Sequence, residues 1–365
     1  MDSTTVATHV TLLVTLHVRG TSFPVNRWGT ECKASDYNAT PCGCYGGAAR
    51  RQAFLAPASL ETNTVAIDAG SYFYGHGLFF PSFQGNASAD FFARGAYDAF
   101  GWQYRDLTAF AGSDDDGTAA LAAHLSRIRA LDPSLPLATA TNLDVSGTAL
   151  EGLVQPFTIV PLANNASLAL LCLLDRTDLL ATNPTIGARV FGFRQALHAA
   201  LAQLRQLPGG MPELVVLTVD GGHRLRLDYE GEADEAALSA SEESWQTILQ
   251  LAREADGVDV VIASAKEPDY VTGPVVVETW SGEHTLVVPP AGAYQPLPSG
   301  TGLGHIALNV SAALDASGAL LPNASSAQWR TLDCTVAEDG ATRADLLEWH
   351  AQMLENLGGI SGYLA

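Results

Sequence analysis

The sequence predicts an α/β fold with a largely parallel sheet at its core. Short runs of apolar and β-branched residues, each of strand length, recur along the chain. Segments with helical character lie between many of these runs, and this alternation is typical of parallel sheets. The 365 residues are 47% hydrophobic, which is enough for a sizeable core.

The first predicted strand lies in residues 11–20, TLLVTLHVRG, whose apolar first half is followed by a polar turn. The stretch 21–44 looks irregular and ends before Gly46-Gly47, where a helix over 48–55 is expected. A short buried strand follows over 64–68. Residues 87–94 are then expected to be helical.

In the middle of the chain, the acidic run 113–117 precedes a helix over 118–131, and we interpret it as a solvated turn that caps this helix rather than a calcium loop. Strands are expected over 137–140, 157–161 and 168–174. Apolar residues at 3.6 spacing predict a helix over 191–207, which Pro208-Gly209-Gly210 ends.

The last third of the chain begins with a strand over 214–218, and the acidic segment 228–243 is expected to be an exposed insertion. A helix over 245–255 precedes a buried strand over 258–262. We expect a second, partly antiparallel layer and a final amphipathic helix over 343–357. The strands assigned to that layer are 275–278, 285–288 and 304–310.

The charge is strongly acidic, with 19 Lys and Arg against 39 Asp and Glu and a formal net charge of -20. Nucleic acids and anionic membranes are poor partners for such a surface. No apolar run reaches the ~18 residues of a membrane-spanning helix, and the amino terminus lacks the basic region of a signal peptide. We therefore expect no membrane span in this chain.

Asparagine and cysteine usage favours a secreted or cell-surface glycoprotein. Five Asn-x-Ser/Thr sequons occur, at Asn38, Asn86, Asn165, Asn309 and Asn323. Three of the five cysteines cluster in one loop, which in such a chain indicates disulfide bonding rather than zinc, because no fourth ligand is near. These are Cys32, Cys42 and Cys44. The odd count leaves at least one thiol unpaired or paired outside the chain.

Polar residues follow four of the predicted strands, and ligands in α/β sheets sit at the carboxyl ends of strands. These positions are His17 to Arg19, Ser71, Val219-Asp220 and residues 265–267.

Several short motifs in sequence order resemble the 5′-nucleotidase branch of the calcineurin-like metallophosphoesterases. They are the loop 32–44 with Gly46-Gly47-Ala48-Ala49-Arg50, Ile67-Asp68-Ala69-Gly70, Tyr97-Asp98-Ala99, Thr182-Asn183-Pro184 and residues 257–261. The resemblance implies a metallophosphoesterase-like sandwich of two mixed β-sheets flanked by helices. It also implies a disulfide loop, for which we expect Cys32 to pair with Cys44.

The same resemblance implies a domain plan. Residues 1–340 would form the metallophosphoesterase-like domain and 341–358 a linker helix. Residues 359–365 would start a C-terminal domain that is absent or not included here. In the family, that second domain supplies the aromatic clamp for the nucleoside.

The family's metal ligands are replaced in this sequence. Active members hold two metal ions with an Asp-x-His, a bridging Asp, an Asn-His pair, a lone His and a His-x-His. The corresponding positions are His17, Arg19, Ser71, Tyr104, Arg105, Val219, Ala265 and Glu267. Arginine cannot bind a metal ion, so we expect a degenerate site without a metal cofactor.

The leading hypothesis is a catalytically inactive phosphoesterase, a pseudoenzyme, that serves as a structural or interaction component with protein partners in an extracellular or cell-surface assembly. Arg19, Arg105 and Glu267 would then form an ion-pair cluster beside His17. In a variant of this hypothesis, Arg19, Arg105 and Lys266 bind a phosphate or sulfate group.

The alternative is a metal-dependent hydrolase of nucleotides or other phosphoesters with a rearranged site holding two divalent ions. Its candidate ligands are His17, His76, Asp106, Asp220, His223 and Glu267. Finally, the aromatic run 72–80 could form a contact surface, although core packing is the commoner use of such residues.

Overall fold

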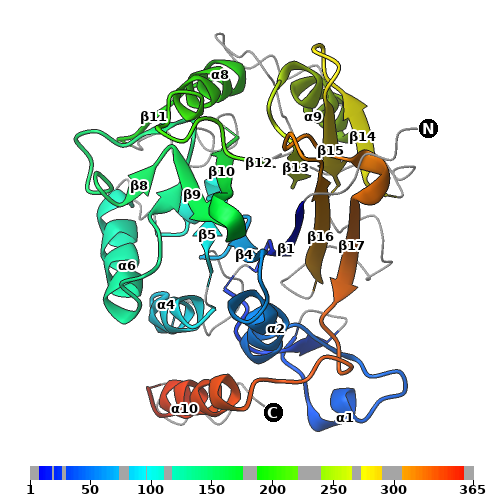
Figure 1. Ribbon diagram of the computed structural model, residues 1–365. Coiled ribbons are helices and arrows are strands. Elements are labelled where there is room, and N and C mark those ends of the chain that lie inside the picture. Colours follow the sequence, from blue (N-terminus) through cyan, green and yellow to red (C-terminus); the bar gives the residue numbers. More distant parts are fainter. Residues whose placement is uncertain are drawn as a thin grey trace.

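The structure is a computed structural model that describes residues 8–18, 20–26, 30–73, 82–95, 97–110, 117–175, 187–220, 240–264, 273–289 and 306–356. Two main β-sheets face each other (Figure 1). The first has the order β17 (Ser326–Thr331), β16 (Ile306–Leu314), β1 (Thr8–Thr15), β4 (Thr64–Asp68) and β5 (Ala99–Phe100). The second has the order β14 (Val275–Glu278), β15 (His284–Val288), β13 (Val260–Ala263), β12 (Leu214–Val219), β10 (Ser167–Leu173) and β9 (Phe157–Pro161).

Both sheets are mixed. In the first sheet β1, β4 and β5 run parallel, whereas β16 and β17 are added in antiparallel fashion. In the second sheet the four central strands run parallel, and β9 and β14 are antiparallel edge strands. This confirms the predicted sandwich of two mixed sheets.

Alternation along the strands builds the core between the sheets. Val10, Leu12 and Val14 of β1 are completely buried, and they share one apolar cluster with Leu168 and Leu170 of β10. Because side chains on a strand point alternately to opposite faces, the remaining residues of these strands face the helices outside the sandwich.

Helices cover both outer faces (Figure 1). On the first sheet they are α2 (Ala48–Leu55), α4 (Asn86–Ala93), α5 (Tyr104–Thr108) and α6 (Thr118–Leu131), and on the second α8 (Phe193–Leu204) and α9 (Ala240–Glu254). The last helix, α10 (Gly340–Asn356), packs against α2. Short elements complete the described fold: β2 (Val25–Asn26), α1 (Ala34–Tyr37), β3 (Cys44–Tyr45), η1 (Ala56–Ser59), β6 (Ala138–Thr139), β7 (Leu143–Asp144), β8 (Val154–Gln155), η2 (Ala163–Asn165), β11 (Arg189–Val190) and η4 (Pro322–Ala324).

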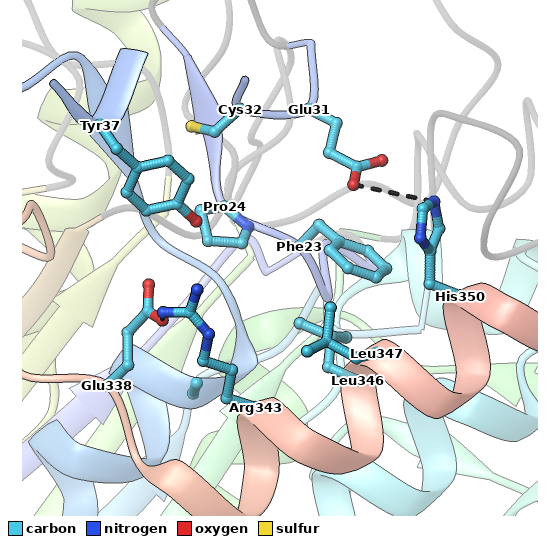
Figure 2. A pocket seen from close by; sticks show the side chains of 11 residues that line it. Phe23, Pro24, Glu31, Cys32, Tyr37, Glu338, Arg343, Leu346, Leu347 and His350 are labelled. Carbon is cyan, nitrogen blue, oxygen red and sulfur yellow. Dashed lines mark hydrogen bonds and ion pairs between the residues drawn. The ribbon is translucent and has the colours of Figure 1, made fainter. Parts of the chain in front are cut away.

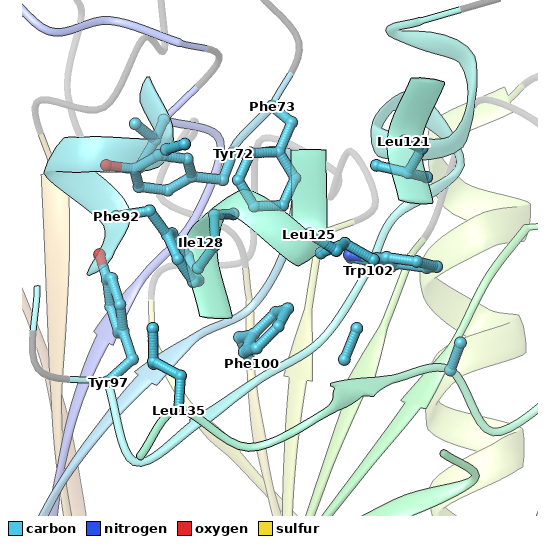
Figure 3. Packing of buried hydrophobic residues seen from close by; sticks show 14 of the residues in the cluster. Tyr72, Phe73, Phe92, Tyr97, Phe100, Trp102, Leu121, Leu125, Ile128 and Leu135 are labelled. Atoms are coloured by element: carbon cyan, nitrogen blue, oxygen red, sulfur yellow. The ribbon is translucent and has the colours of Figure 1, made fainter. Parts of the chain in front are cut away.

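An aromatic cluster fills the core beneath α4 and α6 (Figure 3). The ring centroids of Tyr72 and Phe92 are 4.7 Å apart, and those of Phe92 and Tyr97 are 4.8 Å apart. Tyr72 and Phe73 of the aromatic run are therefore core residues; positions 74–80 of that run lie outside the described residues.

Two disulfides staple the end of the molecule that carries α10. Cys32 pairs with Cys44, as expected, and Cys42 pairs with Cys334 across a sequence separation of 292 residues. Cys172 is buried and is not in a disulfide. The odd cysteine is thus an internal thiol.

Two expectations about the last third of the chain were wrong. The strands over 275–278, 285–288 and 304–310 do not share one layer, because β15 pairs with β13 in the second sheet whereas β16 pairs with β1 in the first. The acidic segment 228–243 is not entirely an insertion, because α9 already begins at Ala240. Residues 113–116, 182–184 and 228–239 lie outside the described residues.

Candidate functional site

The carboxyl ends of β1, β4 and β12 meet the amino-terminal end of α5. Asp68, the last residue of β4, is buried there, and its Oδ2 accepts a hydrogen bond from Oγ1 of Thr15 at 2.5 Å. The Thr15 hydroxyl also lies 2.9 Å from the hydroxyl of Tyr97. Burial, with the charge of Asp106 as a further cause, holds the pKa of Asp68 well above its usual range.

Asp106 ties the loop after β4 to the start of α5. Its Oδ2 accepts hydrogen bonds from the backbone N–H groups of Ser71 at 2.7 Å and Gln103 at 3.0 Å, and its Oδ1 accepts one from Phe73 at 2.9 Å. The bond to Gln103 is the one that an acidic residue makes in a capping box. Burial raises the pKa of Asp106 to about 6, although these backbone donors favour the charged form.

The backbone at Gly70 and Ser71 has a conformation that this arrangement requires. Both have positive φ, +100° for Gly70 and 58° for Ser71. A Cβ at Gly70 would lie 2.7 Å from the Gln103 side chain, so only glycine fits. The Ser71 hydroxyl donates to Oε1 of Gln103 at 2.7 Å.

Asp220, rather than Val219, faces this cluster. Its Oδ2 accepts a hydrogen bond from the backbone N–H of Tyr104 at 2.6 Å, so two carboxylates bind successive N–H groups at the start of α5. Val219 points to the other side of the sheet, where it is buried with Leu217 in the apolar cluster beneath α8 and α9. Val219, the predicted counterpart of the family's lone histidine, is therefore a core residue.

Cys172 lies in the same buried region. Its thiol donates to the carbonyl oxygen of Trp102 at 2.7 Å, and burial raises its pKa to about 12. A Cβ at Gly101 would lie 2.8 Å from its sulfur, which shows how closely the chain entering α5 passes over β10. Cys172 and Gln103 were not among the predicted site residues. The Gln103-x-x-Asp106 spacing is the signal in the sequence that indicates a helix start here.

The remaining predicted positions divide into two groups. His17 follows β1 with a φ of 52°, and its N–H donates to the Gly70 carbonyl at 3.1 Å. Arg105 lies on α5, where its Cζ is 5.1 Å from the centroid of the Tyr104 ring. The other positions lie outside the described residues: Arg19, His76, His223, Ala265, Lys266 and Glu267. The expected ion-pair cluster and the anion site thus remain predictions.

Several side chains described at these strand ends are engaged within the fold. No group of three or more His, Cys, Asp or Glu side chains among the described residues could hold a metal ion. The Ser71 hydroxyl is used by Gln103, both oxygens of Asp106 accept backbone N–H groups, and Val219 lies in the core. These hydrogen bonds hold the start of α5 against the loop after β4.

A surface pocket of about 230 Å³ lies elsewhere, between the disulfide loop and α10 (Figure 2). Phe23 and Leu346 form part of its apolar wall. At one end, Nε2 of His350 lies 4.0 Å from Oε1 of Glu31. Burial raises the pKa of Glu31, and the charge of His350 lowers it by a smaller amount. Arg343 pairs with Glu338 at the other end.

All five sequon asparagines lie among the described residues and are exposed: Asn38, Asn86, Asn165, Asn309 and Asn323. No helix in the described part of the chain is long and apolar enough to cross a membrane.

The fold is that of the 5′-nucleotidases and calcineurin-like phosphoesterases. The chain superposes with a TM-score of 0.69 on a 5′-nucleotidase precursor from Thermus thermophilus, at 20% identity over 96% of this chain and 60% of that one. It also matches an NAD nucleotidase from Haemophilus influenzae (TM-score 0.62, 12% identity, 95% of this chain and 60% of that one). A calcineurin-like phosphoesterase from Bacillus subtilis matches with a TM-score of 0.60 and 14% identity, over 95% of this chain and 98% of that one.

The chain spans about 60% of the length of the first two of these proteins. No protein-family model and no curated protein matches the sequence. At these identities the comparisons establish the fold alone.

Proposed function

We propose that this protein is a phosphoesterase-fold scaffold that has lost two-metal catalysis and acts as a structural or interaction component of an extracellular or cell-surface assembly. The observation that supports this proposal most directly is the set of hydrogen bonds that Asp106 makes to the backbone. Asp106 directly follows Tyr104 and Arg105, the predicted counterparts of the family's Asn-His pair, and it binds three backbone N–H groups. These three bonds occupy most of the roughly four accepting positions of a carboxylate, so Asp106 holds the fold together.

The neighbouring positions support the same proposal. Hydrolysis by two metals needs carboxylates and imidazoles that converge on one space. Here Ser71 supplies a hydroxyl, Tyr104 a ring and Arg105 a cation, and Val219 is a core residue. A chain that keeps the sandwich while using these positions for packing is suited to binding rather than turnover.

The proposed compartment is extracellular, with protein partners and glycans at the sequons. Two disulfides are typical of oxidising environments. The exposure of all five sequon asparagines leaves room for glycans on the folded protein. We also propose that residues 1–340 form the phosphoesterase-like domain and that 341–358 serve as its linker helix.

The test is hydrolysis of AMP and of a generic phosphodiester by the full chain, in parallel with zinc, manganese or cobalt. The proposal predicts no turnover above that of the metal ions alone. Turnover that is lost in Asp220→Asn, but kept in the remote surface variant Leu60→Ala, would instead support the rearranged hydrolase site. Leu60 is a suitable control because its side chain is 82% exposed.

A further inference from the structure

The second sheet ends on one side in β14, an edge strand of four residues with the sequence Val-Val-Val-Glu (Figure 1). No described strand pairs with its outer edge. An edge strand without a partner presents a row of backbone donors and acceptors to any extended segment that can reach it.

The register shows which backbone groups of β14 point to this outer edge, which we call the open edge because no described strand pairs with it. Val277 is opposite Thr285, and the next pair along the hairpin joins Thr279 N–H to the Glu283 carbonyl at 2.9 Å. Hydrogen-bonded pairs alternate along an antiparallel ladder, so Thr279, Val277 and Val275 bond toward β15. The N–H and C=O groups of Val276 and Glu278 therefore point to the open edge.

Apolar side chains accompany this open edge. Val276 is 42% exposed and Trp280, in the turn that follows, is 71% exposed, whereas Val277 is buried beneath α9. The turn is fixed to the end of α9, because the Trp280 N–H donates to the Arg253 carbonyl at 3.0 Å. An exposed tryptophan on a fixed turn is characteristic of the anchors that dominate protein interfaces.

Carboxylates on or beside the hairpin favour a basic partner, although Arg253 also lies at the end of α9 next to Trp280. Glu278, Glu283 and Asp256 carry carboxylates on or beside the hairpin, and the whole chain has a formal net charge of -20. Two copies of such a surface repel each other, whereas a segment rich in Lys or Arg is attracted. None of the five sequons falls between residues 166 and 308, so the hairpin carries no glycosylation site of its own.

We propose that β14 and Trp280 form a docking site for an extended, basic segment of a partner protein, which adds a strand to the second sheet. The segment would hydrogen-bond to Val276 and Glu278, place an apolar side chain near Trp280 and pair its cations with the carboxylates. This deepens the proposed function, because it names the chemistry of the partner, but it does not depend on the loss of catalysis. Phosphatase turnover would refute the scaffold role and leave this binding result standing.

The probe is a fluorescent eight-residue peptide of alternating Lys and Val, with a Glu and Val peptide as its matched control. We expect the full chain to bind the basic peptide at least ~10-fold more tightly than the acidic one. Val276→Pro removes an outward N–H and no ladder hydrogen bond, and edge strands tolerate such a proline, so this variant should fold and lose binding ~10-fold. Trp280→Ala should weaken binding similarly, and Glu278→Lys should reduce the preference for the basic peptide.

The control is again Leu60→Ala, which removes an exposed apolar side chain elsewhere and should bind as wild type does. Thermal melting of each variant shows whether it is folded; if Val276→Pro is not, Trp280→Ala and Glu278→Lys decide the question. Absence of binding at millimolar peptide, or equal binding by Trp280→Ala and Glu278→Lys, would overturn the proposal. A wild-type dimer that becomes monomeric in Val276→Pro would overturn it too, since the occupant would then be a second copy.

Discussion

Replacing Asp106 by alanine tests whether this carboxylate is a structural anchor. The substitution leaves the N–H groups of Ser71, Phe73 and Gln103 without their acceptor in a fully buried place. Unsatisfied buried donors cost about 1–3 kcal/mol each, so at about 2 kcal/mol each the three together cost about 6 kcal/mol. The substitution also removes a buried charge, which offsets part of this loss.

The offset follows from the pKa of Asp106. It is raised from 3.8 to about 6, so folding favours the protonated form, and wild-type stability falls as pH rises from about 3.8 to 6. At pH 7 the two-unit shift corresponds to about 3 kcal/mol, which leaves a net loss of about 3 kcal/mol for Asp106→Ala. At pH 5 the offset is only about half as large, so the variant should lose about 1 kcal/mol more there.

Urea unfolding of the full chain at pH 7 and pH 5 measures both effects. The matched control is Asp315→Ala, because Asp315 also accepts three hydrogen bonds, from the N–H groups of Ser317 and Ala319 and the hydroxyl of Ser317, but in a surface turn. Water can replace these bonds, so the control should lose clearly less. Equal losses in the two variants, or an Asp106→Ala loss that shrinks on acidification, would refute the anchoring role.

Two further predictions concern the core and the disulfides. His124 is buried between the rings of Phe73 and Phe110, and neither of its ring nitrogens has a hydrogen-bond partner among the described residues. Burial, together with the charge of Arg127, lowers the pKa of His124 from 6.5 to about 3; Arg127 is itself paired with Asp90. The free energy of unfolding of the wild type should therefore fall as pH drops from 6.5 toward 3, by about 2 kcal/mol at pH 5. His124→Leu should lack this pH-dependent loss in urea unfolding. An equally large loss in the variant would contradict this role of His124. Replacing Cys42 and Cys334 by serine should cost more than replacing Cys32 and Cys44, about 5 against about 3 kcal/mol, because their sequence separations are 292 and 12 residues. Thermal melting of the two double variants gives the order, and a larger loss for the shorter loop would be inconsistent with the chain-entropy argument.

Local patterns were sufficient to predict much of the fold. The helices over 48–55 and 118–131 and the strands over 64–68 and 157–161 have the predicted bounds, because turn residues flank regular apolar patterns there. β17 was missed because its half-buried and exposed positions alternate among mostly polar residues. The placement of β14 and β15 in the second sheet depends on pairing with β13, which no local pattern encodes.

The candidate site depended more strongly on contacts between distant residues. Counting along the chain located Val219 and Asp220, but which of them faces α5 is decided by the register of β12 in its sheet. The roles of Asp106 and Gln103 arise from contacts with the loop after β4, more than thirty residues away. Likewise, the bond between Cys42 and Cys334 joins residues that are 292 positions apart in the sequence.

The most direct test of the central claim is the metal content of the full chain, purified without chelators and equilibrated with zinc and manganese. Elemental analysis, together with calorimetric titration of each ion, gives the number of ions bound per chain. We predict no stoichiometric binding of either ion, because the side chains described at the strand ends are engaged by the backbone and by one another. Two tightly bound ions per chain, as a two-metal phosphoesterase requires, would contradict it.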